Sequence, residues 1–214
     1  MCTIKKTKLE LKKCFRKPIP EIYIASEYLN EAITNHLLGN FEIAENLIRK
    51  SDMVSIRNWT ESIWGKKSPY INFTKTENSP PILKKSERIE TRMPNKALKN
   101  KLIERDGYNC VFCGTPLIRS EIRKKIKNLY PNALKWGRKN IDQHAAFQAM
   151  WLQYDHLLPH SRGGNNDINN LVITCAPCNF GRMEYTLTEV GIKNPLKTKK
   201  IKSNWDGLER ILNQ

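Results

Sequence analysis

The sequence contains four cysteines, in two closely spaced pairs, that could bind a metal ion. Cys110 and Cys113 form one Cys-x-x-Cys pair, and Cys175 and Cys178 form the other. Two intervening residues let both thiolates of a pair reach the same ion from a tight turn, so two such pairs suit one tetrahedral Zn²⁺. Reduced core cysteines and disulfides are the alternatives. Because the spacing recurs on both sides, we expect a structural zinc site with a whole element inserted between its halves.

The segment between and beside these pairs carries groups for acid–base chemistry and cation binding. Asp155 and His156 are adjacent, a glycine-bearing loop follows them, and Asn179 stands directly after the last cysteine. The histidine could act as a base, because an unperturbed imidazole has a pKa near ~6.5 and keeps a neutral fraction at physiological pH. The carboxylate and the amide supply two oxygen donors for a hard divalent cation.

These residues resemble the signature of the HNH endonuclease family. The family pattern reads Asp-His-x-x-Pro-x-x-x-Gly-Gly, then Asn-Leu, then Cys-x-x-Cys-Asn. The chain matches it at Asp155, His156, Pro159, Gly163, Gly164, Asn170, Leu171, Cys175, Cys178 and Asn179. The resemblance extends from Gly107 to about Gly191. It implies a nuclease with a ββα-metal fold, in which a strand ends at Asp155 and His156, a long loop and a second strand follow, and a helix starts near Asn179.

The resemblance also implies a role for each residue of the signature. His156 would take the proton from the attacking water, and Asp155 would hold the catalytic metal ion. Asn179 occupies the position where family members carry Asn or His as a metal ligand, and the all-oxygen choice favours Mg²⁺ or Mn²⁺. Asn170 matches an asparagine that pins the loop through backbone hydrogen bonds, which is a supporting role.

Three further residues near the signature could meet the substrate. His160 lies four positions after His156 and could reach the phosphate or the metal, with a solvent-exposed loop histidine as the alternative. Arg162 and Arg182 flank the site, and their forked guanidinium groups could contact phosphate oxygens. In the family pattern a basic residue follows the asparagine and a glycine comes next. Here Gly181 precedes the arginine, so Arg182 departs from the pattern.

The chain is strongly basic, which indicates a nucleic-acid partner. Lys and Arg total 37 and Asp and Glu total 21, which gives a formal net charge of +16 and a pI near 9.7. Between the cysteine pairs, residues 119–139 form a central basic block with a single acidic side chain, Glu121. We expect phosphate contacts from Lys124, Lys125 and Lys127 of this block. A solvated helix face is the alternative.

The elements that must position these groups follow from the hydrophobic pattern. Apolar residues recur with a helical period over residues 25–38, and further helices are predicted at 42–50, 52–64 and 94–105. Residues 66–93 are rich in Ser, Pro, Thr, Asn and Lys, which predicts a linker. Strands are predicted over 149–154 and 171–174. A helix over 180–190 would end at Gly191.

These elements predict an α+β chain, with a mainly helical N-terminal region and a small ββα-metal nuclease domain that carries structural zinc. The expected division is a helical region of unknown role at 1–65, a linker at 66–93, an HNH nuclease domain at 94–191 and a basic C-terminal extension at 192–214. No segment approaches the ~18 apolar residues of a membrane span. The basic N-terminus lacks the apolar core of a secretory signal. We therefore expect a cytoplasmic protein with no membrane association.

The resulting hypothesis is a metal-dependent HNH endonuclease that hydrolyses phosphodiester bonds. DNA is the favoured substrate because the family mostly cuts DNA, and RNA is the alternative. A role in restriction or antiphage defence follows by analogy. The N-terminal helices could bind a protein partner or recognise DNA. Two other functions are weighed against this one: a catalytically idle, zinc-stabilised nucleic-acid-binding module, and a conditional nuclease subunit of a larger complex.

Overall fold

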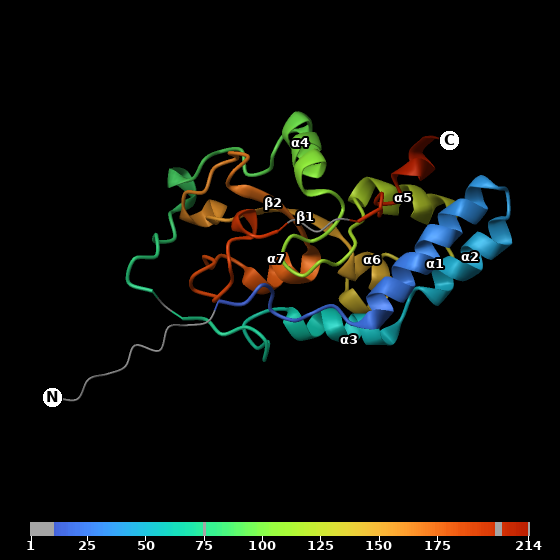
Figure 1. Cartoon of the computed structure of the whole chain (residues 1–214), viewed down its shortest axis with the longest axis horizontal. Coiled ribbons are helices and arrows are strands. Elements are labelled where there is room, and N and C mark those ends of the chain that lie inside the picture. The colour runs from blue at the N-terminus through green and yellow to red at the C-terminus, as the bar shows by residue number, and fades with distance from the viewer. Residues whose placement is uncertain (1–10, 75, 200–202, 214) are drawn as a thin grey trace.

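The computed structural model describes residues 11–74, 76–199 and 203–213 (Figure 1). These residues contain seven α-helices and one two-stranded antiparallel sheet, which confirms the predicted α+β class with a helical N-terminal region. Residues 1–10 of the predicted helical region, and residues 200–202 and 214 of the predicted C-terminal extension, lie outside the described residues. No helix in the described part of the chain has the length and apolar character needed to cross a membrane.

Three helices form the N-terminal region, close to the predicted positions. They are α1 (Pro20–Leu37), α2 (Phe41–Lys50) and α3 (Val54–Ile63). Helix α1 starts earlier than predicted because Pro20 opens it. Proline suits the first turn, where its missing N–H would have no partner in any case. Gly39, with a φ of 82°, allows the chain to reverse into α2.

The two strands and the helix after them form a ββα unit. Strand β1 (Leu152–His156) pairs antiparallel with β2 (Leu171–Cys175), so that Asp155 lies opposite Val172 and His156 opposite Leu171. Helix α7 (Ala176–Arg182) follows β2 directly and packs against both strands. The arrangement leaves the end of β1, with Asp155 and His156, beside the end of α7.

The helix predicted over residues 180–190 is wrong in its bounds. Helix α7 begins at Ala176, with Pro177 in its first turn, and ends at Arg182. Met183 then takes a φ of 53°, a left-handed conformation that a right-handed helix cannot continue. Residues 183–191 therefore form turns and irregular backbone instead of a helix.

Three helices lie between the N-terminal region and β1. They are α4 (Lys96–Asp106), α5 (Ser120–Leu129) and α6 (Ala145–Ala149). Asn95 caps α4, because its side-chain oxygen accepts a hydrogen bond from the backbone N–H of Leu98 at 2.9 Å. Helices α5 and α6 and strand β1 occupy the long interval between the two cysteine pairs, which confirms the expected insertion.

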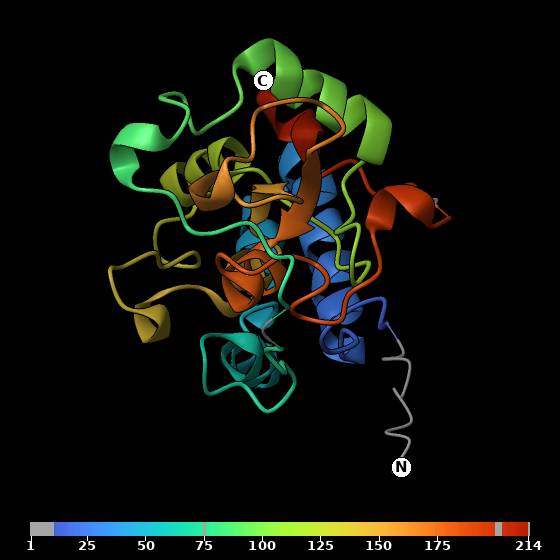
Figure 2. The ribbon, with the colours of Figure 1, turned by 90° about the vertical axis from the view of Figure 1, so that its left-hand side faces the viewer.

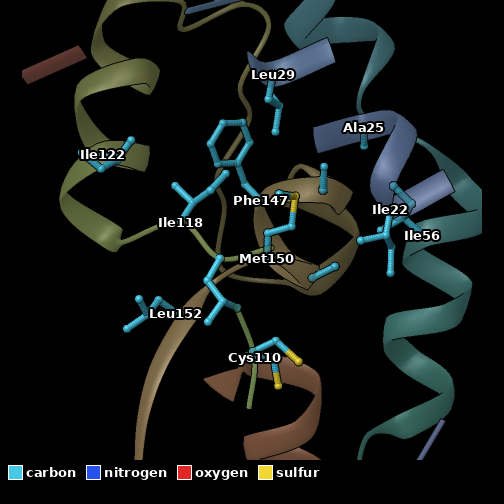
Figure 3. Packing of buried hydrophobic residues seen from close by; sticks show 14 of the residues in the cluster. Ile22, Ala25, Leu29, Ile56, Cys110, Ile118, Ile122, Phe147, Met150 and Leu152 are labelled. Atoms are coloured by element: carbon cyan, nitrogen blue, oxygen red, sulfur yellow. The ribbon is translucent and has the colours of Figure 1, made fainter. Parts of the chain in front are cut away.

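Helix α6 lies in the middle of the hydrophobic core (Figure 3). Phe147 and Met150 are buried there, between Leu29 of α1 on one side and Ile118 and Ile122 on the other. The buried hydrophobic cluster continues without a break from the N-terminal helices to Cys110, Cys175 and Cys178. The helical region and the ββα unit are thus packed on one core.

The N-terminal helices touch the site helix directly at Gly181. A Cβ atom at this position would lie 2.8 Å from the carbonyl oxygen of Ile63 and 2.9 Å from Cδ1 of Ile71. Beside this contact, the rings of Trp64 and Phe180 meet edge to face with centroids 5.7 Å apart. The backbone at the end of α3 therefore packs directly against α7, with no side chain of Gly181 between them.

We predict that Gly181→Ala lowers the free energy of unfolding by about 1–2 kcal/mol. The added methyl group forces α3 and α7 apart, which costs about 1–3 kcal/mol, and the better helix propensity of alanine offsets up to about 1 kcal/mol of this. Urea denaturation followed by circular dichroism measures the change. The control is Asn128→Ala on the exposed face of α5, which should stay within about 0.5 kcal/mol of the wild type. A more stable Gly181→Ala protein would contradict the packing described here.

Candidate active site and metal centre

The four predicted zinc ligands converge on one point. The ligand atoms of Cys110, Cys113, Cys175 and Cys178 all lie within 4.8 Å of one another, and Sγ of Cys113 is 3.6 Å from Sγ of Cys175. Zn–S bonds of about 2.3 Å in a tetrahedron place sulfur atoms about 3.8 Å apart. The cysteines of the described residues are free thiols and form no disulfide. The cluster could therefore hold one Zn²⁺.

Local backbone geometry brings each pair into place. The N–H of Gly114 donates to the carbonyl of Cys110 at 2.8 Å, which closes a tight turn around the first pair. Within this turn the N–H of Val111 donates to the carbonyl of Ile173 at 3.1 Å and so fastens the turn to β2. The second pair lies where β2 passes into α7. A bound ion would therefore join the first pair to the ββα unit.

The protonation of these thiols fits a cation at their centre. Burial raises the pKa of Cys175 well above its ordinary value. Burial acts to raise the pKa of Cys110 too, but hydrogen bonds from the other three cysteines lower it well below its ordinary value. In the absence of a cation, thiol protons supply the hydrogen bonds that join these sulfurs. A divalent ion replaces those protons as the partner of the buried sulfurs.

The residues predicted to do the chemistry lie around a separate cavity of about 430 Å³. Five predicted site residues line it: Asp155, His156, His160, Asn179 and Arg182. Among the described residues, Asn170, Arg162 and the three predicted lysines of the central basic block do not line this cavity. The structure thus brings together the histidine, the carboxylate and the amide of the signature.

A hydrogen-bonded asparagine orients His156. Nε2 of His156 lies 2.9 Å from Oδ1 of Asn166, and Nδ2 of Asn166 donates to the carbonyl of Thr91 at 2.8 Å. Because Oδ1 is an acceptor, Nε2 carries the proton and Nδ1 remains as the basic nitrogen. Burial lowers the pKa of His156, against the hydrogen bond that it donates to Asn166 and the charge of Asp155, which raise it. The imidazole is therefore neutral at pH 7.

A buried arginine holds Asp155 beside this histidine. Nε of Arg182 donates to Oδ2 of Asp155 at 3.1 Å, and Nη2 donates to Oδ1. The same guanidinium donates to the carbonyls of His156 at 2.5 Å and of Tyr185 at 2.7 Å. Each carboxylate oxygen keeps lone pairs for a further ligand, so Asp155 could still hold a cation. Phosphate contact by Arg182 itself stays a prediction.

Arg162 is engaged within the fold in the same way. Its Nη2 lies 3.2 Å from Oε2 of the buried Glu189, its Nε donates to the carbonyl of Glu184 at 2.7 Å, and its Nη1 donates to the carbonyl of Pro80 at 2.5 Å. Its side chain is nearly enclosed. These contacts fasten the site loop to its surroundings, and phosphate contact by Arg162 also stays a prediction.

Asn170 and Gly164 close the loop that follows β1. Oδ1 of Asn170 accepts from the N–H of Leu158 at 2.8 Å, and its Nδ2 donates to the carbonyl of Asn165 at 2.9 Å. At Gly164 a Cβ atom would lie 1.8 Å from the carbonyl oxygen of Leu158. Only glycine fits this approach. Asn170 therefore positions the loop backbone from outside the cavity.

The segment predicted as a linker runs across this loop. We call residues 80–93 the strap; it contains a short 3₁₀ turn, η1 (Lys85–Glu87), and lies beside the loop in two perpendicular views (Figures 1 and 2). The N–H of Leu83 donates to the carbonyl of Ser161, and Nε2 of His160 donates to the carbonyl of Ile89, each at 2.8 Å. With the contacts to Pro80 and Thr91 given above, the strap holds the loop at four points.

The central basic block lies apart from the cavity, on α5 and the loop after it. Lys124 is exposed, Lys125 is partly exposed, and Nζ of Lys127 lies 3.4 Å from the carbonyl of Trp136. Arg123 of the block turns inward, with its guanidinium carbon 3.5 Å from the ring centroid of Trp136. Contact of these lysines with nucleic acid stays a prediction.

Sequence reasoning assigned no role to Asn166 or to the strap arginines Arg88 and Arg92, which also line the cavity. Asn166 lies in the run of turn-forming residues after Gly164, and that run was interpreted only as a turn. Nothing in the local pattern of residues 80–93 pointed to the site, because their contacts with it are long-range. The one feature of the sequence that could have indicated a role for the strap is the presence of Arg88 and Arg92 in a segment otherwise typical of a linker.

We predict that Cys110→Ser or Cys178→Ser releases zinc and unfolds the nuclease region, because structural Zn²⁺ in small modules contributes on the order of 10 kcal/mol to folding. Elemental analysis should give one zinc ion per wild-type chain, and circular dichroism should report the loss of structure. Cys14→Ser is the matched control, since Cys14 lies outside the four-cysteine cluster, and it should keep its zinc. A fully folded wild-type protein without zinc would refute the assignment.

Comparison with known proteins agrees with this geometry. The model of the HNH endonuclease family matches residues 144–187, a range that contains β1, the loop, β2 and α7. Searches of curated proteins and of solved structures give no match to the chain. The matched range carries Asp155, His156, Asn170 and Asn179 at the positions of the family signature. The chain therefore contains a domain of the HNH endonuclease family.

Proposed function

We propose that this protein is a metal-dependent endonuclease that hydrolyses phosphodiester bonds in DNA. One observation carries the proposal: His156, Asp155 and Asn179 line the same cavity, and three arginines line it with them. An attacking water needs a base, and the charge that builds on the phosphate needs neutralisation. The cavity gathers groups for both tasks.

The proposed roles follow from the contacts of each side chain. Nδ1 of His156 receives the proton of the attacking water, because Nε2 is committed to Asn166. Asp155 and Asn179 would hold Mg²⁺ or Mn²⁺, since two protein oxygen donors leave the remaining positions to water and phosphate, as these ions favour. When bound, such an ion neutralises charge on the phosphate and lowers the pKa of a bound water. Arg182 holds the carboxylate of Asp155 in place through two hydrogen bonds.

Two features support nucleic acid as the substrate, and DNA is the proposed form because the family mostly cuts it. The net charge of +16 favours a polyanion. The cavity of about 430 Å³ is also lined by three arginines, Arg88, Arg92 and Arg182. We further propose a role in restriction or antiphage defence, by analogy with other family members. Phage plating on bacteria that express the wild type or His156→Ala tests it: equal plating would reject that role.

We predict that His156→Ala reduces DNA cleavage by about 10²- to 10⁴-fold, because it removes the base. Folding and DNA binding should change little, since among the described side chains the imidazole hydrogen-bonds only Asn166 and otherwise meets the ring of His160, with centroids 5.8 Å apart. The assay follows supercoiled plasmid, linear duplex and RNA with Mg²⁺ and with Mn²⁺. His160→Ala is the matched variant and should lose less activity. Cleavage by His156→Ala near the wild-type rate would transfer the role of base to His160. A wild type that binds DNA but never cuts it would favour the idle binding module.

We predict that replacing Lys124, Lys125 and Lys127 with Gln weakens DNA binding about equally for all sequences. Each lost phosphate contact should reduce the slope of log K against log salt by about 0.9 on duplex DNA. Cleavage at saturating DNA should persist, because these lysines lie outside the cavity. Fluorescence anisotropy over a range of salt concentrations gives the slope. An unchanged slope would assign the central basic block to a solvated helix face.

A further inference from the structure

The strap presents to the cavity one arginine that has no hydrogen-bond or ion-pair partner among the described residues. Arg88 and Arg92 both line the cavity. Nε and Nη2 of Arg88 donate to the carbonyl of Leu83 at 3.0 and 2.8 Å, so Arg88 stiffens the strap itself. The side chain of Arg92 is exposed and makes no hydrogen bond or ion pair with any described residue. Its guanidinium therefore retains all of its donors for a ligand.

The other two arginines of this region are differently placed. Arg162 and Arg182 are buried, and each is paired with a buried carboxylate, Glu189 and Asp155 respectively. Removing either arginine from its partner would leave an unpaired charge in the interior, at a cost of several kcal/mol. A phosphate that displaced either carboxylate would incur this cost. Phosphate binding by Arg92 carries no such cost, because its side chain is exposed to solvent at the cavity.

The backbone just before Arg92 is held in place relative to the proposed catalytic histidine, His156. Its neighbour Thr91 accepts a hydrogen bond from Nδ2 of Asn166, whose Oδ1 orients His156. Two residues earlier, the carbonyl of Ile89 accepts from His160. A phosphate held by Arg92 would therefore occupy a defined position beside the basic nitrogen of His156.

We propose that Arg92 binds a phosphate of the nucleic-acid strand in the active-site cavity and that the strap positions it there. The forked guanidinium can meet two phosphate oxygens at once, which a lysine cannot reproduce. Arg92 acts on substrate binding and positioning, and it moves no proton. This inference rests on the proposed nuclease function, but it concerns a binding contact that can be measured without cleavage.

The test measures duplex DNA binding by fluorescence anisotropy across a salt series, in the His156→Ala background so that the DNA stays intact. Arg92→Gln should weaken binding by about tenfold and reduce the salt slope by about 0.9. Arg92→Lys should keep the slope while recovering only part of the affinity. Lys50→Gln is the charge-matched control, an exposed residue of α2 at the opposite end of the molecule from the strap (Figure 1), and should match its parent.

Cleavage assays with an active His156 separate this inference from the proposed function. For Arg92→Gln, KM should rise more than kcat falls. If the wild type cuts DNA and Arg92→Gln binds and cuts like Lys50→Gln, the inference is overturned and the nuclease function stands. If the wild type never cuts but Arg92→Gln still loses affinity and salt slope, the nuclease function fails and the phosphate contact stands. Absence of any binding by the wild type would overturn both.

Discussion

The buried ion pair between Arg182 and Asp155 connects the parts of the site that come from different elements. It links the last residue of α7 to the end of β1, and the same guanidinium reaches the backbone of His156 and of the turn after α7. Each of these buried charges needs its partner, because removing one member of a buried ion pair typically lowers the free energy of unfolding by about 3–5 kcal/mol. The position of the proposed metal ligand and of the proposed base therefore depends on one arginine.

This constraint also explains why the chain departs from the family order of glycine and basic residue. Gly181 is needed where α7 meets the carbonyl of Ile63, at a distance that admits no side chain. Arg182 follows on the next position, where it faces β1 instead of α3. The contact with α3 fixes the rotation of α7, and that rotation aims the guanidinium at Asp155. The N-terminal helices thus contribute to the site through packing, at a distance from the cavity.

The parts of the site that the sequence predicted are those with short-range spacing. The cysteine pairs and the Asp155–His156 dipeptide can each be recognised within a few residues of sequence. The fold brings the four cysteines together, and it places Asp155 and His156 at the same cavity. The bounds of α7 were missed because the sequence has no helix-breaking residue between Gly181 and Gly191, whereas the chain leaves the helix at Met183, a non-glycine residue with a φ of 53°. Arg162 and Arg182 were interpreted as phosphate ligands because the sequence does not show that Glu189 and Asp155 are buried beside them.

The strap escaped sequence analysis for a related reason, which also bears on how it works. Its hydrogen bonds with the loop use the N–H of Leu83 and the carbonyls of Pro80, Ile89 and Thr91, which are all main-chain atoms of the strap. Main-chain contacts leave no signature in residue types. They also leave the strap side chains free to face the substrate, because a change of side chain does not break the attachment. A segment with the composition of a linker can therefore form a fixed wall of the cavity, which Arg88 and Arg92 line with their side chains.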